Sequence, residues 1–255
     1  MAMSDTALIA QLQPKLARRL KPVYNQAGRV IALDLSGFGL HDLPLEVCQL
    51  TALEALYLNL KVDDNGLRWE ADIERNWLST LPDEIAQLRQ LRVLELHGNQ
   101  LQSLPSSMTR LKHLVSLDLQ DNPLHTVPEV VWQLHRLQTL NLRRTQLRNL
   151  PAHIAQLAHL QELSLADNQL STLPAQFVHL KHLSSLKLNN NPISTLPWLL
   201  TQMQQLRQLN LFGCQLKELP IELKNLTQLT ELRLTANPLL SRQTEHLPAQ
   251  AKVFF

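Results

Sequence analysis

Glycine, cysteine and aromatic residues are scarce in this chain of 255 residues. It contains six Gly, two Cys, four Trp, two Tyr and five Phe. Two cysteines, Cys48 and Cys214, are too few for a disulfide framework or for a structural zinc site, which needs about four ligands. We interpret both as reduced thiols and expect a reducing, cytoplasmic location.

A strong excess of charge and long apolar segments are also missing. The formal net charge of +2 is too small to indicate nucleic-acid binding through electrostatics. No apolar run approaches the roughly 18 residues that a membrane-spanning helix needs. Residues 1–5 lack the basic and apolar regions that open a signal peptide. We therefore expect a chain that neither binds nucleic acid nor inserts into a membrane.

A 23-residue repeat fills most of the chain. Its frame is L-x-x-L-x-L-x-x-N-x-L-x-x-L-P-x-x-h-x-x-L-x-x, where h is apolar. Its first position falls at Val30, Leu53, Leu91, Leu114, Leu137, Leu160, Leu183, Leu206 and Leu229. Every step is 23 residues except the step from 53 to 91, which is 38 residues and therefore holds a 15-residue insertion within 59–75. The pattern predicts nine stacked repeats over residues 30–239, the last of them incomplete.

Each repeat combines two local signals. Leu117 and Leu119 alternate with polar neighbours, which predicts a short strand with the leucines pointing inward. The Leu-Pro pair that follows predicts a return on the other side of the coil, because proline fixes φ and sacrifices only an amide without a ladder partner. A short helix or 3-10 turn, such as residues 152–157, should come next.

Asparagine recurs at the ninth position of the frame. A buried amide there can bond backbone groups of its own coil and of the neighbouring coil. We expect a structural ladder formed by Asn76, Asn99, Asn122, Asn168, Asn191 and Asn237. Phe38, Thr145 and Cys214 interrupt it, and Cys214 is interpreted as structural.

Segments with different patterns flank the repeats. Residues 1–29 predict a helical cap, because leucines recur at every fourth position: Leu8, Leu12, Leu16 and Leu20. Ser4 or Asp5 can begin the helix, and Pro14 should either kink it or start a second helix. Residues 240–255 predict a C-terminal cap with an edge strand, from the alternation of Ala251, Val253 and Phe255. We expect the chain to end there, without a separate catalytic domain.

The frame resembles the 23-residue LPxxh class of leucine-rich repeats, which is found in bacterial cytoplasmic proteins, Roco GTPases and the Ras-group repeat proteins of plants and animals. The resemblance implies an α/β fold, a right-handed horseshoe-shaped solenoid. A parallel sheet would line its concave face, and short helices or 3-10 turns its convex side. It also implies a protein partner on the concave face, without naming that partner. The GxxxxGK[ST] phosphate loop that a Roco GTPase domain needs is absent.

Strand periodicity indicates which side chains line the concave face. Tyr57 and Phe212 are the aromatic residues among them, and aromatic residues often anchor interfaces. The expected partner-binding set is Tyr57, Glu95, His97, Asp118, Gln120, Asp121, Asn141, Arg143, Arg144, Asp167, Lys187, Asn189, Asn210, Phe212 and Arg233. The alternative is that the acids and arginines only pair with one another on a solvated surface.

The insertion offers a second candidate contact. Arg68, Trp69 and Glu70 lie within it, and loops on a rigid scaffold often carry recognition. The alternative is that Trp69 packs against the rim of the solenoid. The Asp63–Gly66 stretch lacks the ligand spacing of a calcium loop, so we expect no metal there.

No catalytic, metal or cofactor site is expected. Cys48 has no visible neighbour that would stabilise a thiolate. His159 and His182 share one repeat position, which is interpreted as a solvated ridge. We therefore expect a monomeric scaffold or adaptor that binds a protein and is not an enzyme. A translocated effector that binds a host protein is the alternative, and a repeat-containing ubiquitin ligase is the less favoured third.

Overall fold

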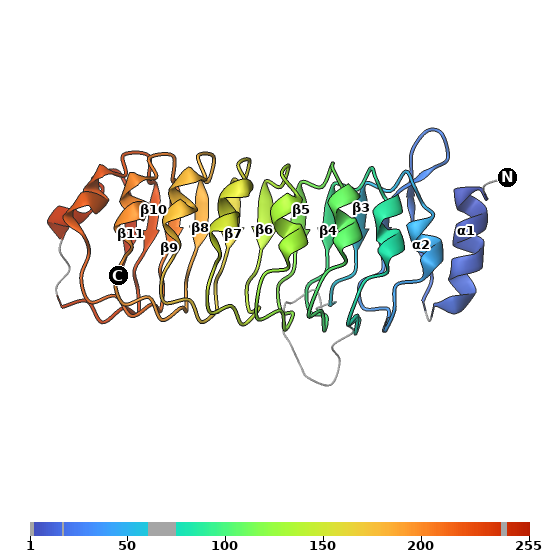
Figure 1. Cartoon of the computed structure of the whole chain (residues 1–255), viewed down its shortest axis with the longest axis horizontal. Helices are drawn as coiled ribbons and strands as arrows, with labels where there is room; N and C mark the ends of the chain where they lie inside the picture. The colour runs from blue at the N-terminus through green and yellow to red at the C-terminus, as the bar shows by residue number, and fades with distance from the viewer. Residues whose placement is uncertain (1–2, 17, 61–74, 241–243) are drawn as a thin grey trace. The chain divides into compact units, whose positions relative to one another are not determined.

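The computed structural model describes residues 3–16, 18–60, 75–240 and 244–255. The chain forms two compact units, whose helices and strands are labelled in Figure 1. The first comprises Met1–Pro123 with Pro128–Leu134, and the second comprises Leu124–Val127 with His135–Phe255.

The first unit begins with helices and continues as a sheet. Its helices are α1 (Asp5–Leu12) and α2 (Leu45–Cys48), with 3-10 helices at Gln13–Lys15, Asp83–Gln87, Ser106–Arg110 and Glu129–Gln133. Its strands are β1 (Val23–Tyr24), β2 (Val30–Asp34), β3 (Ala55–Tyr57), β4 (Val93–Glu95) and β5 (Ser116–Asp118). The strands pair in chain order, β1 antiparallel to β2 and the rest parallel.

The second unit repeats one strand-turn pattern. Its strands are β6 (Thr139–Asn141), β7 (Glu162–Ser164), β8 (Ser185–Lys187), β9 (Gln208–Asn210), β10 (Glu231–Arg233) and β11 (Lys252–Phe254). The 3-10 helices are Ala152–Gln156, Ala175–His179, Trp198–Gln202, Ile221–Asn225 and Thr244–His246. All six strands pair in parallel and in chain order.

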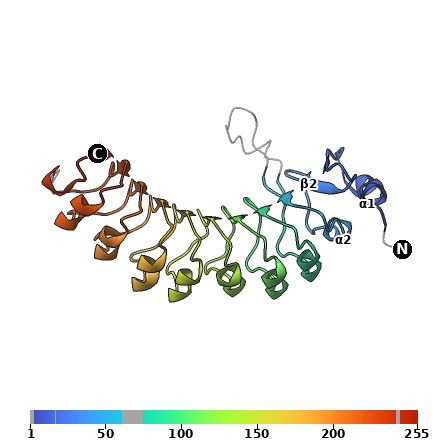
Figure 2. The ribbon, with the colours of Figure 1, turned by 90° about the horizontal axis from the view of Figure 1, so that it is seen from above.

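The strand register follows from the leucines. In the second unit Leu163 pairs with Leu186, Leu186 with Leu209, and Leu209 with Leu232, and all four are buried. The residues on either side of each leucine point to the opposite face and are at least partly exposed. Within each unit the 3-10 helices lie on the side away from the strands (Figure 2). The predicted α/β solenoid, with a parallel sheet on one side and short helical turns on the other, is confirmed.

The N-terminal segment agrees only in part with the expected helical cap. Helix α1 ends at Leu12, and Pro14 lies at the start of the 3-10 helix that follows, which is the second of the two alternatives expected for it. Leu16 and Leu20 are buried outside the helix. Residues 23–24 form β1, a strand that the four-residue leucine spacing did not predict.

Asp5 joins this cap to the first repeat. Ser4 is the N-cap, and its hydroxyl accepts a hydrogen bond from the Ala7 amide at 3.2 Å. Asp5 is buried and accepts a hydrogen bond from the Val30 amide at 2.7 Å. It also pairs with Arg29, with 3.0 Å between Oδ1 and Nε. The carboxylate thereby fixes the position at which β2 begins.

Asparagine amides link successive repeats. Asn99 donates from Nδ2 to the carbonyls of Leu58 and Leu96, both at 2.9 Å, and accepts from the Leu78 amide at 3.1 Å. The same three kinds of bond are made by Asn76, Asn122, Asn168, Asn191 and Asn237. Thr145 and Cys214 each donate to one carbonyl in place of an asparagine. Phe38 is partly exposed.

Replacing Asn122 with leucine should destabilise the fold. The change leaves the carbonyls of Leu96 and Leu119 and the amide of Leu101 without their partner in a buried turn. We expect the free energy of unfolding in urea to fall by about 3 kcal/mol, since an unsatisfied buried group costs roughly 1–3 kcal/mol. The control is Asn225→Leu at an exposed position, which should change it by less than about 0.5 kcal/mol. Equal effects of both variants would contradict the structural role of Asn122.

Candidate partner-binding surface

The outward-facing residues of the strands form a continuous surface in each unit. We call it the strand face and define it, for β3 to β10, by the first and third residues of each strand and the residue two positions after the third. All fifteen residues of the expected binding set are at least partly exposed. Asp121, Arg144 and Asp167 lie one residue beyond the strand face, at the edge where the strands end. Two other strand-face residues, Asn59 and Ala166, are buried and offer little contact area.

In the first unit the strand face is acidic. The strand register places Tyr57 beside Glu95 and Glu95 beside Asp118. His97 and Gln120 follow two residues later on the same face. The Asn59 amide donates to Glu95 at 2.5 Å, and the Gln120 amide donates to Asp121 at 2.9 Å. Neutral amides therefore help to hold two of the three predicted carboxylates in place.

Several strand-face side chains also form a hydrogen bond to the backbone at the turn where their own strand ends. Asp118 accepts a hydrogen bond from the amide of Gln120 at 2.8 Å, two residues later. Asn141 and Asn210 accept in the same way, from the next-but-one amide at 3.2 and 3.0 Å. Short polar side chains make such local turns readily. The strand periodicity predicts only a binding role for these residues and does not indicate this structural role, although Asp and Asn at the strand end are its signal.

In the second unit Arg143, Arg144 and Asp167 come together. The Nε atoms of Arg143 and Arg144 lie 2.5 and 3.8 Å from Asp167 Oδ2, and Asn190 donates to Oδ1 at 2.6 Å. Burial raises the pKa of the Asp167 carboxyl. The hydrogen bonds from Asn190 and Arg143 and the charges of the two arginines outweigh that effect, and the pKa lies below its ordinary value. Pairing within the surface, the alternative considered for these charges, therefore occurs at this cluster.

Other residues of the binding set in the second unit lie outside this cluster. Phe212 is exposed over 41% of its surface. Lys187 lies beside Asn210, which lies beside Arg233, in one row across β8, β9 and β10. Arg233 is paired with Glu231 at 2.5 Å and stacks 5.4 Å from the centre of the Phe254 ring. Lys187 makes no ion pair with any residue that the structure describes.

The candidate contacts of the insertion, Arg68, Trp69 and Glu70, lie outside the described residues. Just after that stretch the Arg75 guanidinium stacks 3.9 Å from the centre of the Trp77 ring, and Trp77 is 39% exposed.

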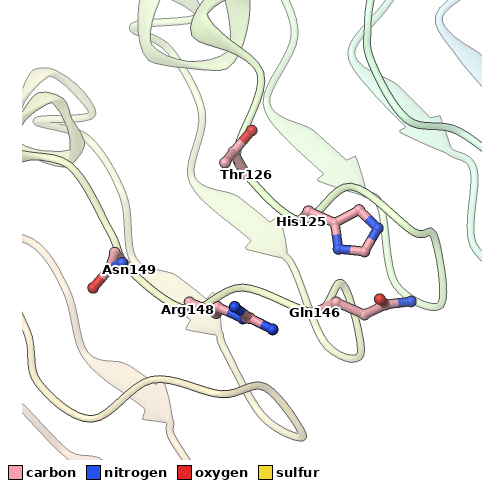
Figure 3. Close-up of a pocket in the computed structure, with 5 residues that line it drawn as sticks. All are labelled: His125, Thr126, Gln146, Arg148 and Asn149. Carbon is pink, nitrogen blue, oxygen red and sulfur yellow. The ribbon is translucent and has the colours of Figure 1, made fainter.

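An open pocket of about 420 Å³ lies in the second unit. His125, Thr126, Gln146, Arg148 and Asn149 line it (Figure 3). All five residues are exposed, whereas small-molecule sites bury most of their ligand. The Arg148 guanidinium donates to the Gln169 side chain at 3.2 Å. This geometry does not point to a particular small ligand.

Catalytic chemistry finds little support in the described residues. Burial, with a smaller contribution from the charge of Glu84, raises the pKa of Cys48 to about 12. Burial also raises the pKa of Cys214, to about 11. Both are therefore thiols at neutral pH and poor nucleophiles. His159 and His182 stack with ring centres 6.1 Å apart, and the described residues contain no group of three or more metal-binding side chains. Every described helix is too short or too polar to cross a bilayer.

Sequence models of known families match most of the repeat region. A model described as "Leucine-rich repeat region" matches residues 117–249, and one described as "Leucine rich repeat" matches residues 72–124. No curated protein matches this chain.

Solved structures of repeat proteins are similar. A leucine-rich repeat protein of Leptospira interrogans is 34% identical over 88% of this chain and 54% of its own, with a TM-score of 0.75. The leucine-rich repeat domain of the type III effector XopL is 26% identical, over 70% of this chain and 73% of its own, with a TM-score of 0.59. The ectodomain of the Arabidopsis thaliana receptor kinase GASSHO1/SCHENGEN3, in complex with CASPARIAN STRIP INTEGRITY FACTOR 2, is 25% identical over 91% and 32%, with a TM-score of 0.64. This chain therefore spans about half of the Leptospira chain.

Replacing Asp167 with asparagine should lower stability in a pH-dependent way. Because the folded-state pKa lies below the ordinary value, the charged carboxylate stabilises the fold at neutral pH, and this contribution is lost as pH falls through the folded-state pKa. At pH 7 we expect the free energy of unfolding to fall by about 1 kcal/mol. The difference from the native chain should shrink below about pH 3.9. Glu222→Gln, at an exposed 3-10 position, is the control, and a difference independent of pH would contradict this role.

Proposed function

The chain belongs to the leucine-rich repeat family, and from this membership we propose that it is a scaffold or adaptor that holds a protein partner on its strand face. The observation that carries the proposal is the alternation of buried and exposed side chains along each strand of the repeats. The central leucine and the leucine after the strand are buried, as Leu186 and Leu188 are in β8, while the side chains between and beside them are at least partly exposed.

Such a surface suits recognition of a protein. Parallel strands lie about 4.8 Å apart, so neighbouring repeats present side chains at a spacing that an extended segment or a folded surface can follow. Tyr57 and Phe212 supply aromatic contact area, and aromatic residues are enriched among the residues that dominate binding energy. A non-enzymatic role agrees with the raised pKa of both cysteine thiols.

The relatives supply the biological setting for the proposal. The plant ectodomain is in complex with another factor, and the XopL domain belongs to a type III effector. We propose a resident adaptor in the cytoplasm, because both cysteines are free and buried. We propose that it acts as a monomer. The likeness to the XopL domain supports the second setting, a translocated effector that binds a host protein through the same face.

A photo-crosslinker at Phe212 should capture the partner. Phe212 and Trp198 are both exposed aromatic residues of the second unit, at 41% and 70%. Phe212 follows β9 on the strand face, whereas Trp198 begins a 3-10 helix on the opposite side. We expect p-benzoylphenylalanine at position 212 to give a specific adduct on irradiation in a lysate of the producing cells, read by mass spectrometry.

The matched control is the same photo-crosslinker at position 198. It should give at most about a tenth of the adduct, because crosslinking requires direct contact and a partner on the strand face does not reach the other side. An adduct formed equally from both positions, or only from position 198, would place the partner elsewhere and overturn the proposal.

A further inference from the structure

Four residues of the second unit form a compact group on the strand face. Lys187 is paired with Asn210 across β8 and β9. Asn189 and Phe212 lie two residues after Lys187 and Asn210, just beyond the ends of β8 and β9. They are neighbours as well, because the amide of Asn190 donates to the Phe212 carbonyl at 2.8 Å. We call Lys187, Asn189, Asn210 and Phe212 the β8–β9 patch.

The patch presents hydrogen-bond donors that the described residues leave unused. Lys187 has three ammonium donors, and it has no ion-pair partner among the described residues. The Asn189 side-chain amide likewise has no partner within the described chain. The Asn210 side chain accepts from the Phe212 amide through Oδ1 at 3.0 Å, and its two N–H donors have no partner among the described residues. No carboxylate belongs to the patch.

Most acids around the patch are already neutralised. Asp167 is held by Arg143, Arg144 and Asn190, and Glu231 is held by Arg233. Glu162 is exposed, but its paired neighbour on β8 is Ser185 and not Lys187. The ammonium of Lys187 therefore dominates the local field, which favours an anionic group.

Phe212 adds an apolar contact at a defined place. It lies diagonally from Lys187, one strand across and two residues along. Such diagonal neighbours are roughly 7–8 Å apart. Two residues of extended chain span about 6.6–7 Å, so side chains at positions i and i+2 of a bound segment match this separation.

We propose that the β8–β9 patch binds an extended acidic segment of the protein partner, with a Glu or Asp carboxylate on Lys187 and an apolar side chain two residues away on Phe212. The Asn189 and Asn210 amides would donate to the carbonyls of that segment. This inference rests on the proposed function and specifies the chemistry of the partner.

An array of random decapeptides probed with the labelled full-length protein tests the proposal. We expect the bound peptides to be enriched in Glu or Asp two positions from Leu, Ile or Phe. Exchanging that acid for its amide should weaken binding about fivefold, the equivalent of roughly 1 kcal/mol for an exposed ion pair. Binding should also weaken as salt is raised, because the pair is solvent-accessible.

Charge reversal separates recognition from folding. Lys187→Glu should lose the acidic peptides and select peptides with Lys or Arg at the same position, a switch that a merely unstable variant would not show. Lys181→Glu, at an exposed position near the end of the preceding repeat and outside the strands, is the matched control and should keep the acidic preference. No peptide bound, no enrichment in acids, or equal behaviour of the two variants would each overturn the proposal.

Failure of this inference can be told from failure of the proposed function. A partner that crosslinks at position 212 while the array shows no acidic preference keeps the function and refutes the acidic segment. A partner that crosslinks only from position 198 refutes both. Crosslinking at position 212 to a peptide of the partner that carries the acidic and apolar pair supports both.

Discussion

Hydrogen bonds from asparagine amides to the backbone of two successive repeats hold the turn after the strand in six of the nine repeats. Asn191 shows the pattern, since it donates to the carbonyls of Leu165 and Leu188 and accepts from the amide of Leu170. A turn at this point would otherwise bury polar backbone groups without partners, which is costly. Because the amide reaches the preceding repeat as well as its own, the position of one strand fixes the position of the next.

That constraint leaves the strand face free to vary. The leucines and asparagines occupy the inward positions, so most of the outward ones need only be compatible with a strand, whereas Asp118, Asn141 and Asn210 also accept a backbone hydrogen bond at the end of their strand. In the first unit they carry Glu95 and Asp118, whereas in the second they carry Lys187 and Phe212. The two units therefore offer different chemistry on the same backbone, and the proposed acidic segment on the β8–β9 patch depends on this difference.

The repeat spacing was enough to predict the fold class and the strands and 3-10 helices of the repeats, because leucine periodicity determines which residues are buried. The repeat spacing does not predict which long-range contacts the side chains make. The bond from Asp5 to the Val30 amide joins residues 25 positions apart, and nothing in the local pattern of α1 indicates it. The partner-binding set could be chosen from the sequence, because its members alternate with the inward-facing leucines of each strand. Which of its charges are already paired, as Asp167 is and Lys187 is not, depends on side-chain conformations that the sequence does not specify.

Serine substitutions within a single repeat test most directly whether the frame and the strand face are separable. Lys187 and Asn189 are outward residues of this repeat, and Leu186 and Asn191 belong to its frame. Unfolding in urea should show that Lys187→Ser and Asn189→Ser each change the free energy of unfolding by less than about 0.5 kcal/mol. Leu186→Ser and Asn191→Ser should each lower it by at least about 2 kcal/mol. A loss from the outward variants as large as that from the frame variants would show that the strand face is needed for folding, and would contradict its assignment to recognition.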